Sequence, residues 1–263
     1  MRIVSLACSN TEIVHALGCG HLLVGVDDHS DWPEELVAPL PKMGPDLDID
    51  VERVAALEPD LVLATLTVPG HEKVVARLAE AGLPFMAPEP VSVADVYRDI
   101  RDIAHRLDVP ERGEALVSEM AEELGDGAPP EPAPGAPAIL IQWWPKPVIS
   151  PGRLSWAHEA IVLAGGRNPV DEAVKSRPLT NREVAEMAPD AIVLSWCGVR
   201  PEKYRPDVVL QNPDFAEVPA VRRGQVHCVG EPFLGRPGPR LVDGVRRLRE
   251  VVAACVAASP DGR

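Results

Sequence analysis

One segment of this chain occurs twice. Residues 51–67 read VERVAALEPDLVLATLT and residues 181–197 read NREVAEMAPDAIVLSWC, an offset of 130 positions (181 minus 51). In both copies a helical pattern ends at a Pro–Asp pair, and an apolar run follows that is short enough to be a buried parallel strand. The match of residues 62–63 to 193–194 needs a one-residue slip. The repeat predicts two similar α/β lobes, and a cleft between lobes is a common place for a small ligand to bind.

The same offset relates two glutamates that follow the two copies. Glu72 lies in the Pro-containing segment VPGHEK, and Glu202, 130 positions later, lies in VRPEK. Two acids at equivalent places on two lobes would suit a partner that is itself two-fold symmetric. The alternative is that both are ordinary solvated surface glutamates, since charged side chains are mostly exposed.

Composition excludes several classes of partner. The 263 residues carry a net charge of −14, which disfavours binding to a phosphate backbone or an anionic membrane surface, and 46% of them are apolar, enough for packed cores. No apolar run approaches the ~18 residues of a membrane span. The five cysteines form no CxxC pair, so we expect free thiols, buried at Cys197 and Cys228, and a reducing compartment.

The start of the chain bears on where the protein works. Residues 3–7 already read as an apolar strand, without the basic and apolar segments of an export signal before it. We therefore expect a cytoplasmic protein if this start is the native one.

A long amphipathic segment separates the two lobes. Apolar residues recur every three or four positions from Val93 to Leu107, Pro110 interrupts the pattern, and helical character resumes over residues 111–124. A Pro/Gly-rich stretch follows that cannot be regular structure. We therefore expect a stiff bridge between lobes. The predicted division is an N-terminal lobe (1–90), a bridging helix region (91–125), a Pro/Gly-rich connection (126–137) and a C-terminal lobe (138–263).

Half of the ten aromatic residues are tryptophans, and all five fall near the ends of predicted strands. They are Trp32, Trp143, Trp144, Trp156 and Trp196. In open parallel sheets the carboxyl ends of the strands carry the ligand crevice. Phe233 lies in another such loop, and the turn with Arg236 follows it. The pattern predicts an aromatic-lined cleft for a large flat ligand, although Trp156 and Trp196 are equally compatible with core packing.

Motifs for catalysis are absent from the sequence. No serine has a GxSxG context, and the seven histidines show neither HxH nor HExxH spacing. No glycine-rich nucleotide motif is present. His29 beside Asp28 and Asp31 could bind a metal, but a solvated polar loop is the better interpretation. We predict no catalytic site and no metal site.

Several segments together carry a family resemblance. They are VSLACSNTEIVHALG, SDWP, KMGPDLDIDVERVAALEPDLVLA, APDAIVLSW, GGRN and EPFLGRPGPR. The chain resembles, over nearly its whole length, the helical-backbone substrate-binding proteins that serve ABC importers of cobalamin, haem and ferric siderophores. Within this class the cobalamin-binding members are the most similar. The resemblance implies an α/β fold of two Rossmann-like lobes with mainly parallel sheets, joined by one long backbone helix, with the ligand cleft between the lobes.

The resemblance also implies site residues. The corrin ring of cobalamin would contact Trp32, the strand-end residues Trp143, Trp144 and Trp196, and Phe233, with Arg236 in the adjoining turn. Glu72 and Glu202 match the glutamates that dock on the importer's permease. The corrinoid would be transported cargo and not a resident cofactor, the protein would be an exported monomer, and no nucleic acid would be involved.

Three alternatives stay open. The same fold could bind haem or an anionic ferric siderophore, for which Arg153, Arg177 and Arg236 could supply positive charge. A cytoplasmic corrinoid carrier or sensor would agree with the missing export signal. A chelatase of similar fold would need a His/Glu metal pair in the cleft, and none is visible, so we predict that the protein is not an enzyme.

Overall fold

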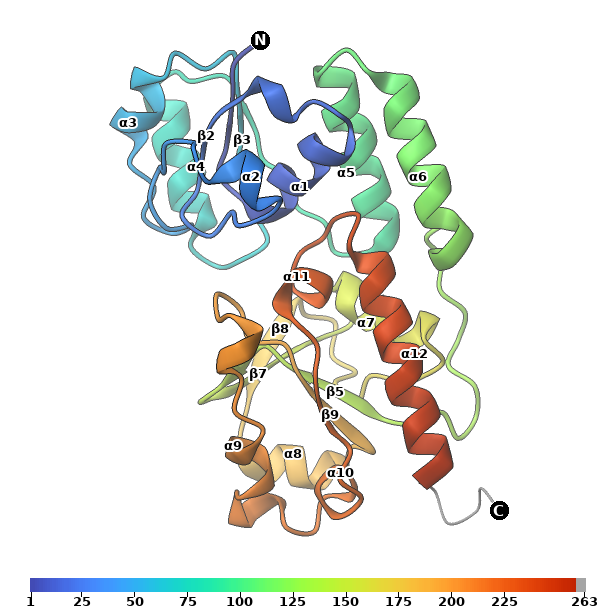
Figure 1. Cartoon of the computed structure of the whole chain (residues 1–263). Coiled ribbons are helices and arrows are strands. Elements are labelled where there is room, and N and C mark those ends of the chain that lie inside the picture. Colours follow the sequence, from blue (N-terminus) through green and yellow to red (C-terminus); the bar gives the residue numbers. More distant parts are fainter. Residues whose placement is uncertain (259–263) are drawn as a thin grey trace. The chain divides into compact units, whose positions relative to one another are not determined.

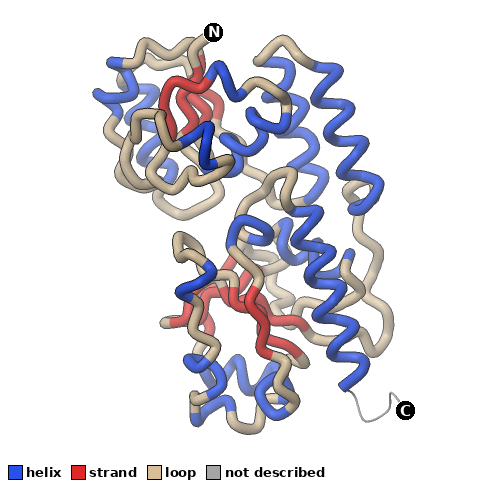
Figure 2. Tube along the Cα trace, in the orientation of Figure 1, coloured by secondary structure: helices blue, strands red, loops and turns tan. Residues whose placement is uncertain are grey.

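The computed structural model describes residues 1–258 and divides into two compact units. Unit 1 comprises Met1–Pro90 and Asp95–Met120, and unit 2 comprises Val91–Ala94 and the chain from Ala121 onward. Each unit contains a parallel sheet with helices around it (Figures 1 and 2). The predicted α/β class with two lobes and parallel sheets is confirmed.

Unit 1 is built on a four-stranded parallel sheet in the order β2-β1-β3-β4. Its strands are β1 (Ile3–Ser5), β2 (Leu23–Val26), β3 (Leu61–Leu63) and β4 (Phe85–Met86). Its helices are α1 (Cys8–Ala16), the 3₁₀ turn η1 (Gly20–Leu22), α2 (Glu34–Val37), α3 (Val51–Ala56), α4 (His71–Glu80) and most of α5 (Val93–Arg106) and α6 (Pro110–Leu124).

The bridging region differs from the single long helix that was expected. It forms two helices, α5 and α6, which lie side by side (Figure 1). Asp108 adopts the left-handed conformation at φ +58° between them, and Pro110 opens α6, where its missing N–H is not needed. Arg101 Nε donates to Glu114 at 2.9 Å across the two helices. The apolar periodicity is the same on both helices, so it does not reveal the reversal of the chain.

Unit 2 contains two three-stranded sheets. A parallel sheet has the order β10-β9-β5, and an antiparallel sheet has the order β6-β7-β8. The strands are β5 (Ile139–Gln142), β6 (Trp144–Pro145), β7 (Val148–Pro151), β8 (Ser176–Leu179), β9 (Ala191–Leu194) and β10 (Val226–Cys228). The antiparallel sheet was not predicted, because prolines in and beside its strands resemble loop sequence.

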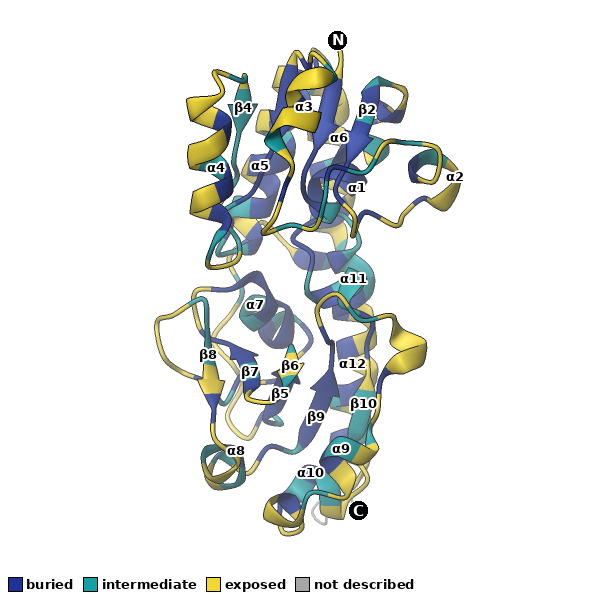
Figure 3. Ribbon diagram, turned by 90° about the vertical axis from the view of Figure 1, so that its left-hand side faces the viewer, coloured by how far each residue is buried: buried dark blue, intermediate teal, exposed yellow. Residues whose placement is uncertain are grey.

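Short helices and one long helix complete unit 2. They are α7 (Trp156–Leu163), α8 (Asn181–Met187), η2 (Pro201–Lys203), α9 (Asp207–Leu210), η3 (Pro213–Phe215), α10 (Pro219–Arg222), α11 (Glu231–Leu234) and α12 (Leu241–Ala258). Residues 125–137 contain neither helix nor strand. Figure 3 shows β5, β7 and β9 in the buried colour, so these strands form the interior of the unit.

Both copies of the sequence repeat fold into the same helix–strand unit. Helix α3 precedes β3, and α8 precedes β9. Strand β3 lies between β1 and β4, and β9 lies between β5 and β10, so each copy supplies an inner strand of a parallel sheet. Leu61 and Ala191 both begin their strands directly after the Pro–Asp pair. The one-residue slip assumed in the sequence comparison is therefore unnecessary.

The aspartate of each Pro–Asp pair binds the backbone of a neighbouring strand segment. Asp60 Oδ2 accepts a hydrogen bond from Arg2 N at 2.6 Å, just before β1. Asp190 Oδ2 accepts one from Ala138 N at 2.9 Å, just before β5. In return, Asp60 N donates to Arg2 O and Asp190 N donates to Ala138 O. These paired bonds align the two strands at the start of each parallel ladder.

The residue before each Pro–Asp pair has left-handed backbone geometry, with φ +46° at Glu58 and +45° at Ala188. A side chain costs roughly 1–2 kcal/mol in this conformation, whereas glycine adopts it freely. Ala188→Gly should therefore raise the free energy of unfolding by about 0.5–1 kcal/mol, measured by urea denaturation. Ala185→Gly, inside α8, is the matched control and should lower it by about 1 kcal/mol. A loss of stability in Ala188→Gly would contradict the strain argument.

Helix α8 begins with a capping box that makes stability depend on pH. Glu183 accepts hydrogen bonds from Thr180 N at 2.7 Å and from Arg177 at 2.8 Å, and Thr180 caps Glu183 N in return. The backbone bond from Thr180, followed by the Arg177 bond, lowers the pKa of Glu183 from 4.5 to about 2. Its contribution to stability is therefore complete above pH 4.5 and is lost as pH falls toward 2.

We expect Glu183→Gln to lower the free energy of unfolding at pH 7. The difference in unfolding free energy between the variant and the native protein should become smaller as the pH falls from 4.5 to 3. Denaturant unfolding at several pH values measures this difference. Glu186→Gln, on the same helix, where Glu186 pairs with Arg182 at the exposed surface, is the control. A difference that stays constant with pH would contradict the role assigned to the Glu183 carboxylate.

Candidate functional site

The loop after β2 presents Trp32 at the surface. The Trp32 side chain is 39% exposed, and its ring meets the His15 ring of α1 edge-on, with centroids 5.0 Å apart. An edge-on contact leaves indole surface open to solvent. The structure thus places an accessible aromatic side chain at the carboxyl end of a parallel strand in unit 1.

A buried hydroxyl network fixes the loop that carries Trp32. Ser30 Oγ donates to Asp27 Oδ1 at 2.5 Å, Thr11 Oγ1 lies 2.8 Å from Ser30 Oγ, and Thr11 Oγ1 donates to Ser5 Oγ at 2.8 Å. Burial raises the pKa of Asp27, while the bonds from Ser30 and from His29 N oppose that rise. The chain of bonds joins the ends of β1 and β2 to α1. Sequence reasoning missed this network, because isolated serines and threonines carry no signal of their mutual contact.

Two tryptophans follow β5 in unit 2. Trp144, on β6, is 44% exposed, whereas Trp143 is half-buried and its ring lies 6.1 Å from that of Trp156. The buried Trp143 Nε1 has no hydrogen-bond partner among residues 1–258. Trp144 is the indole of this unit that is most available to a ligand. Trp156 is buried, and its Nε1 donates to Leu234 O at 2.9 Å.

Trp196 is a core residue, which corrects its assignment to the ligand surface. It is 6% exposed, its Nε1 donates to Gln142 Oε1 at 3.0 Å, and its ring lies 5.4 Å from that of Tyr204. Tyr204 Oη also donates to Trp196 O. With its polar atom satisfied inside the unit and its ring in the core cluster, Trp196 has no free face for a ligand.

Arg236 is also engaged inside its own unit. It is 6% exposed, and its Nε and Nη2 atoms contact the Glu231 carboxylate at distances down to 2.9 Å. The predicted role of Arg236 as a ligand contact is therefore not supported by its burial and pairing. The pair instead closes the turn after α11.

Phe233 is half-buried, and the guanidinium groups of two arginines lie over its ring. Arg240 lies 4.7 Å and Arg247 4.2 Å from the centroid of its ring. Such cation–π contacts are attractive and orient the cations. Phe233 thus orients the two positively charged side chains of Arg240 and Arg247, which the sequence analysis did not identify. Arg247 lies on α12 and Arg240 directly precedes this helix, and their seven-residue spacing is the available signal.

The other arginines considered for an anionic ligand have carboxylate partners. Arg177 contacts Glu172 at 2.6 Å and Glu183 at 2.8 Å, and Arg153 contacts Asp171 at 3.6 Å. These carboxylates offset the positive charge that a siderophore complex would need.

Glu72 and Glu202 are both exposed on their own units. Glu72 lies in the first turn of α4, where its own backbone N–H, followed by that of Gly70 at 2.8 Å, holds the pKa of the carboxyl below its ordinary value. Glu202 lies in η2 and makes no hydrogen bond or ion pair with the residues that the structure describes. Both side chains are accessible to a protein partner.

The described residues contain no cluster of side chains that could bind a metal ion. Over residues 1–258, no three His, Cys, Asp or Glu side chains gather in a way that could hold a metal ion. Cys197 and Cys228 are exposed, which corrects their expected burial, and Cys19 and Cys255 are buried. No helix in this range has both the length and the apolar character that a membrane span requires.

Comparison with known proteins identifies the family. Residues 3–231 match the model of the periplasmic binding protein family. The chain belongs to the periplasmic binding protein family. It is a substrate-binding protein, and the family and the relatives described below are binding proteins and not enzymes.

Three relatives illustrate the likeness. The chain is 28% identical over 257 residues to the uncharacterized ABC transporter substrate-binding lipoprotein YvrC of Bacillus subtilis, covering 95% of this chain and 79% of that protein. It is 26% identical over 250 residues to the vitamin B12-binding protein of Vibrio parahaemolyticus, covering 95% and 88%. The apo periplasmic heme-binding protein RhuT from Roseiflexus superposes with a TM-score of 0.79 at 28% identity, covering 98% of both chains.

The hydroxyl network beneath Trp32 is open to a direct test. Thr11→Val keeps the side-chain volume but removes the hydroxyl shared by Ser5 and Ser30, so the free energy of unfolding should fall by about 1–3 kcal/mol. Urea denaturation measures this loss. Thr67→Val, a half-buried threonine with one side-chain contact, should cost less. Equal losses in the two variants would show that the network does not have the importance assigned to it.

Proposed function

We propose that the protein captures cobalamin or a related corrinoid as a monomer outside the cytoplasmic membrane and delivers it to the permease of an ABC importer. The observation that supports this most is the pair of accessible indoles, Trp32 and Trp144, one in each unit, each beyond the carboxyl end of a parallel strand. Phe233 and the half-buried Trp143 add aromatic surface. The ligand would be cargo, and no step of the proposal needs a resident cofactor.

Exposed indole surface limits how much binding energy these residues can supply. A tryptophan offers roughly 150–250 Å² of surface. With 39% and 44% still exposed, covering each indole is worth about 2 kcal/mol at ~25 cal/mol/Å². Each therefore provides about a quarter of the ~8 kcal/mol of a micromolar complex. A large ligand that also contacts Trp143 and neighbouring backbone groups would supply the rest.

The curated relatives favour cobalamin among flat ligands. The vitamin B12-binding protein of Vibrio parahaemolyticus matches 95% of the chain. Cobalamin carries mostly neutral carboxamide side chains, so its capture needs hydrogen-bonding groups and aromatic surface more than positive charge. This agrees with the pairing of Arg153, Arg177 and Arg236 with carboxylates.

Haem is the second candidate, and a specific observation favours it. Arg240 and Arg247 are held over Phe233, and two guanidinium groups at one place suit the two propionates of haem. The heme-binding protein RhuT has the same fold at 28% identity. The described residues show no His, Cys, Asp or Glu cluster that would add a metal ligand set.

Tryptophan substitutions separate these possibilities. Trp32→Ala and Trp144→Ala should each weaken cyanocobalamin binding by roughly 10- to 30-fold, the equivalent of about 2 kcal/mol. Calorimetric titration with cyanocobalamin and, separately, with hemin measures the affinities. Leu210→Ala, which removes an equally exposed apolar side chain on α9, is the control and should leave binding unchanged. Loss of hemin binding alone in these variants would contradict the corrinoid assignment.

Glu72 and Glu202 are proposed to contact permease arginines. Both are exposed, and they are related by the repeat offset. Glu72→Arg combined with Glu202→Arg should abolish stimulation of the importer's ATPase in proteoliposomes while leaving ligand affinity unchanged, because like charges would then face each other.

A matched double reversal controls for overall charge. Glu52→Arg with Glu250→Arg changes the net charge by the same amount at two other exposed acids. This control should retain most of the ATPase stimulation. If the two double variants behave alike, the docking proposal is wrong.

A further inference from the structure

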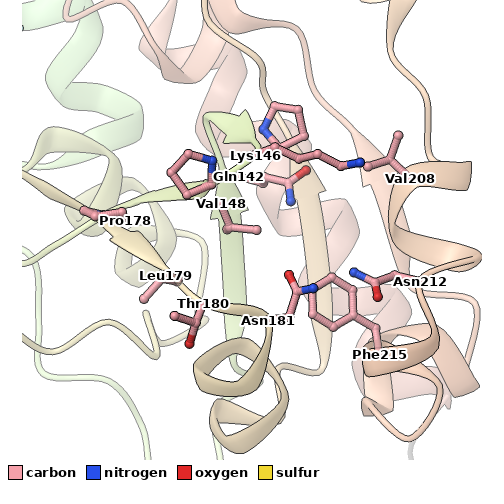
Figure 4. A pocket seen from close by; sticks show the side chains of 12 residues that line it. Gln142, Lys146, Val148, Pro178, Leu179, Thr180, Asn181, Val208, Asn212 and Phe215 are labelled. Atoms are coloured by element: carbon pink, nitrogen blue, oxygen red, sulfur yellow. The ribbon is translucent and has the colours of Figure 1, made fainter.

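Unit 2 contains a pocket that the proposed capture of a flat ligand does not use. It has a volume of about 390 Å³, within the range of small-molecule sites. Figure 4 shows Gln142 and Lys146 on one side of this space and Asn181, Asn212 and Phe215 on the opposite side. The lining residues are Gln142, Pro145, Lys146, Pro147, Val148, Pro178, Leu179, Thr180, Asn181, Val208, Asn212 and Phe215.

The Gln142 side chain directs a hydrogen-bond donor into the pocket. Gln142 is 2% exposed, and its Oε1 accepts the hydrogen bond of Trp196 Nε1 at 3.0 Å. An indole N–H can only donate, so this bond fixes which end of the amide is oxygen. Gln142 Nε2 must then point away from Trp196. Gln142 Nε2 makes no hydrogen bond with residues 1–258, and this atom is not fully buried, so it is a donor accessible from the pocket.

Asn212 contributes a second donor in the same way. Its Oδ1 accepts from Asp214 N at 3.1 Å, which assigns the oxygen and leaves Nδ2 without a partner in the described part of the chain. Asn181 Nδ2 is occupied by Asp214 Oδ2 at 2.8 Å. Lys146 is exposed and forms no ion pair with the described residues, although the chain carries a net charge of −14. The unused groups of this pocket are therefore mainly donors and one cation.

The remaining wall is apolar, and none of the lining residues is acidic. Phe215, Leu179 and Val148 form part of the core of the unit, and three prolines face the same space. A ligand complementary to this pocket has negatively charged acceptor oxygens at one end and an apolar body at the other. We propose that this pocket binds a small organic monocarboxylate, whose oxygens accept from Gln142 Nε2 and Asn212 Nδ2 beside Lys146.

The pocket does not include the Trp143 ring. Gln142 ends β5 and Trp143 follows it directly, and successive residues of an extended strand point to opposite faces. The Trp143 ring packs on Trp156, whereas Gln142 contacts Trp196 on the other face. A monocarboxylate in the pocket would therefore not contact the Trp143 ring.

Benzoate is a suitable probe, because it combines a carboxylate with a compact apolar ring. Titration of the ¹⁵N-labelled protein should shift the side-chain amide signals of Gln142 and Asn212 saturably. Benzamide, without charge, should bind more weakly, and benzylamine, with the opposite charge, should produce no saturable shift. Lys146→Ala should weaken benzoate binding about threefold, as for a partly exposed ion pair.

Asn212→Asp is the decisive variant. It keeps the oxygen that accepts from Asp214 N but replaces the donor with an anion, so benzoate binding should fall at least tenfold while the fold is retained. Lys73→Ala, an exposed lysine of unit 1, should leave the affinity unchanged. Absence of saturable shifts with benzoate, equal binding of benzylamine, or unaltered affinity in Asn212→Asp would each overturn the proposal.

Discussion

The structure depends on the hydrogen bonds that the Pro–Asp turns make with the starts of neighbouring strands. Asp60 binds Arg2 N, and Asp190 binds Ala138 N, each at the first step of a parallel ladder. Strands this short have few ladder bonds of their own, so side-chain acceptors at the ladder start help to fix the register. Once the starts are aligned, the carboxyl ends of the strands and the loops that follow them are positioned as well. Trp32 lies in the loop after β2, and Trp144 lies two residues beyond the end of β5.

Burial separates the structural tryptophans from the candidate ligand contacts. Trp156 and Trp196 are buried, and each indole N–H has an acceptor, Leu234 O and Gln142 Oε1 respectively. A buried indole needs such a partner, because leaving its N–H unpaired costs free energy. Trp32 and Trp144 remain substantially exposed. The same residue type thus serves the core where an acceptor is available and the surface where a large ligand can cover it.

The repeat predicted the most about the fold, because periodicity, the Pro–Asp turn and the apolar run are all local properties. It correctly predicted β3 and β9 as buried strands in two parallel sheets. The antiparallel sheet escaped prediction because Pro145 and Pro178 mask its strands, and the reversal between α5 and α6 escaped because both helices have the same apolar period.

The residues of the ligand site could be predicted only in part, because their contacts in the folded protein are not visible in the sequence. The position of Trp196 at a strand end is visible in the sequence, but its acceptor on Gln142 comes from a strand 54 residues away. Arg236 pairs with Glu231, five residues away, and Arg240 and Arg247 stack on Phe233, so these contacts depend on how the turn after α11 folds. Residue type and spacing identify which side chains could bind a ligand, whereas the folded contacts decide which of them remain accessible.

We expect a flat corrinoid to be bound by the accessible indoles and not by the buried ones. Two-dimensional NMR resolves the five indole N–H signals of the ¹⁵N-labelled protein during titration with cyanocobalamin. The signals of Trp32 and Trp144 should shift saturably and with one-to-one stoichiometry, with those of Trp156 and Trp196 nearly unchanged. Unchanged signals for Trp32 and Trp144 at saturating cyanocobalamin would contradict this expectation.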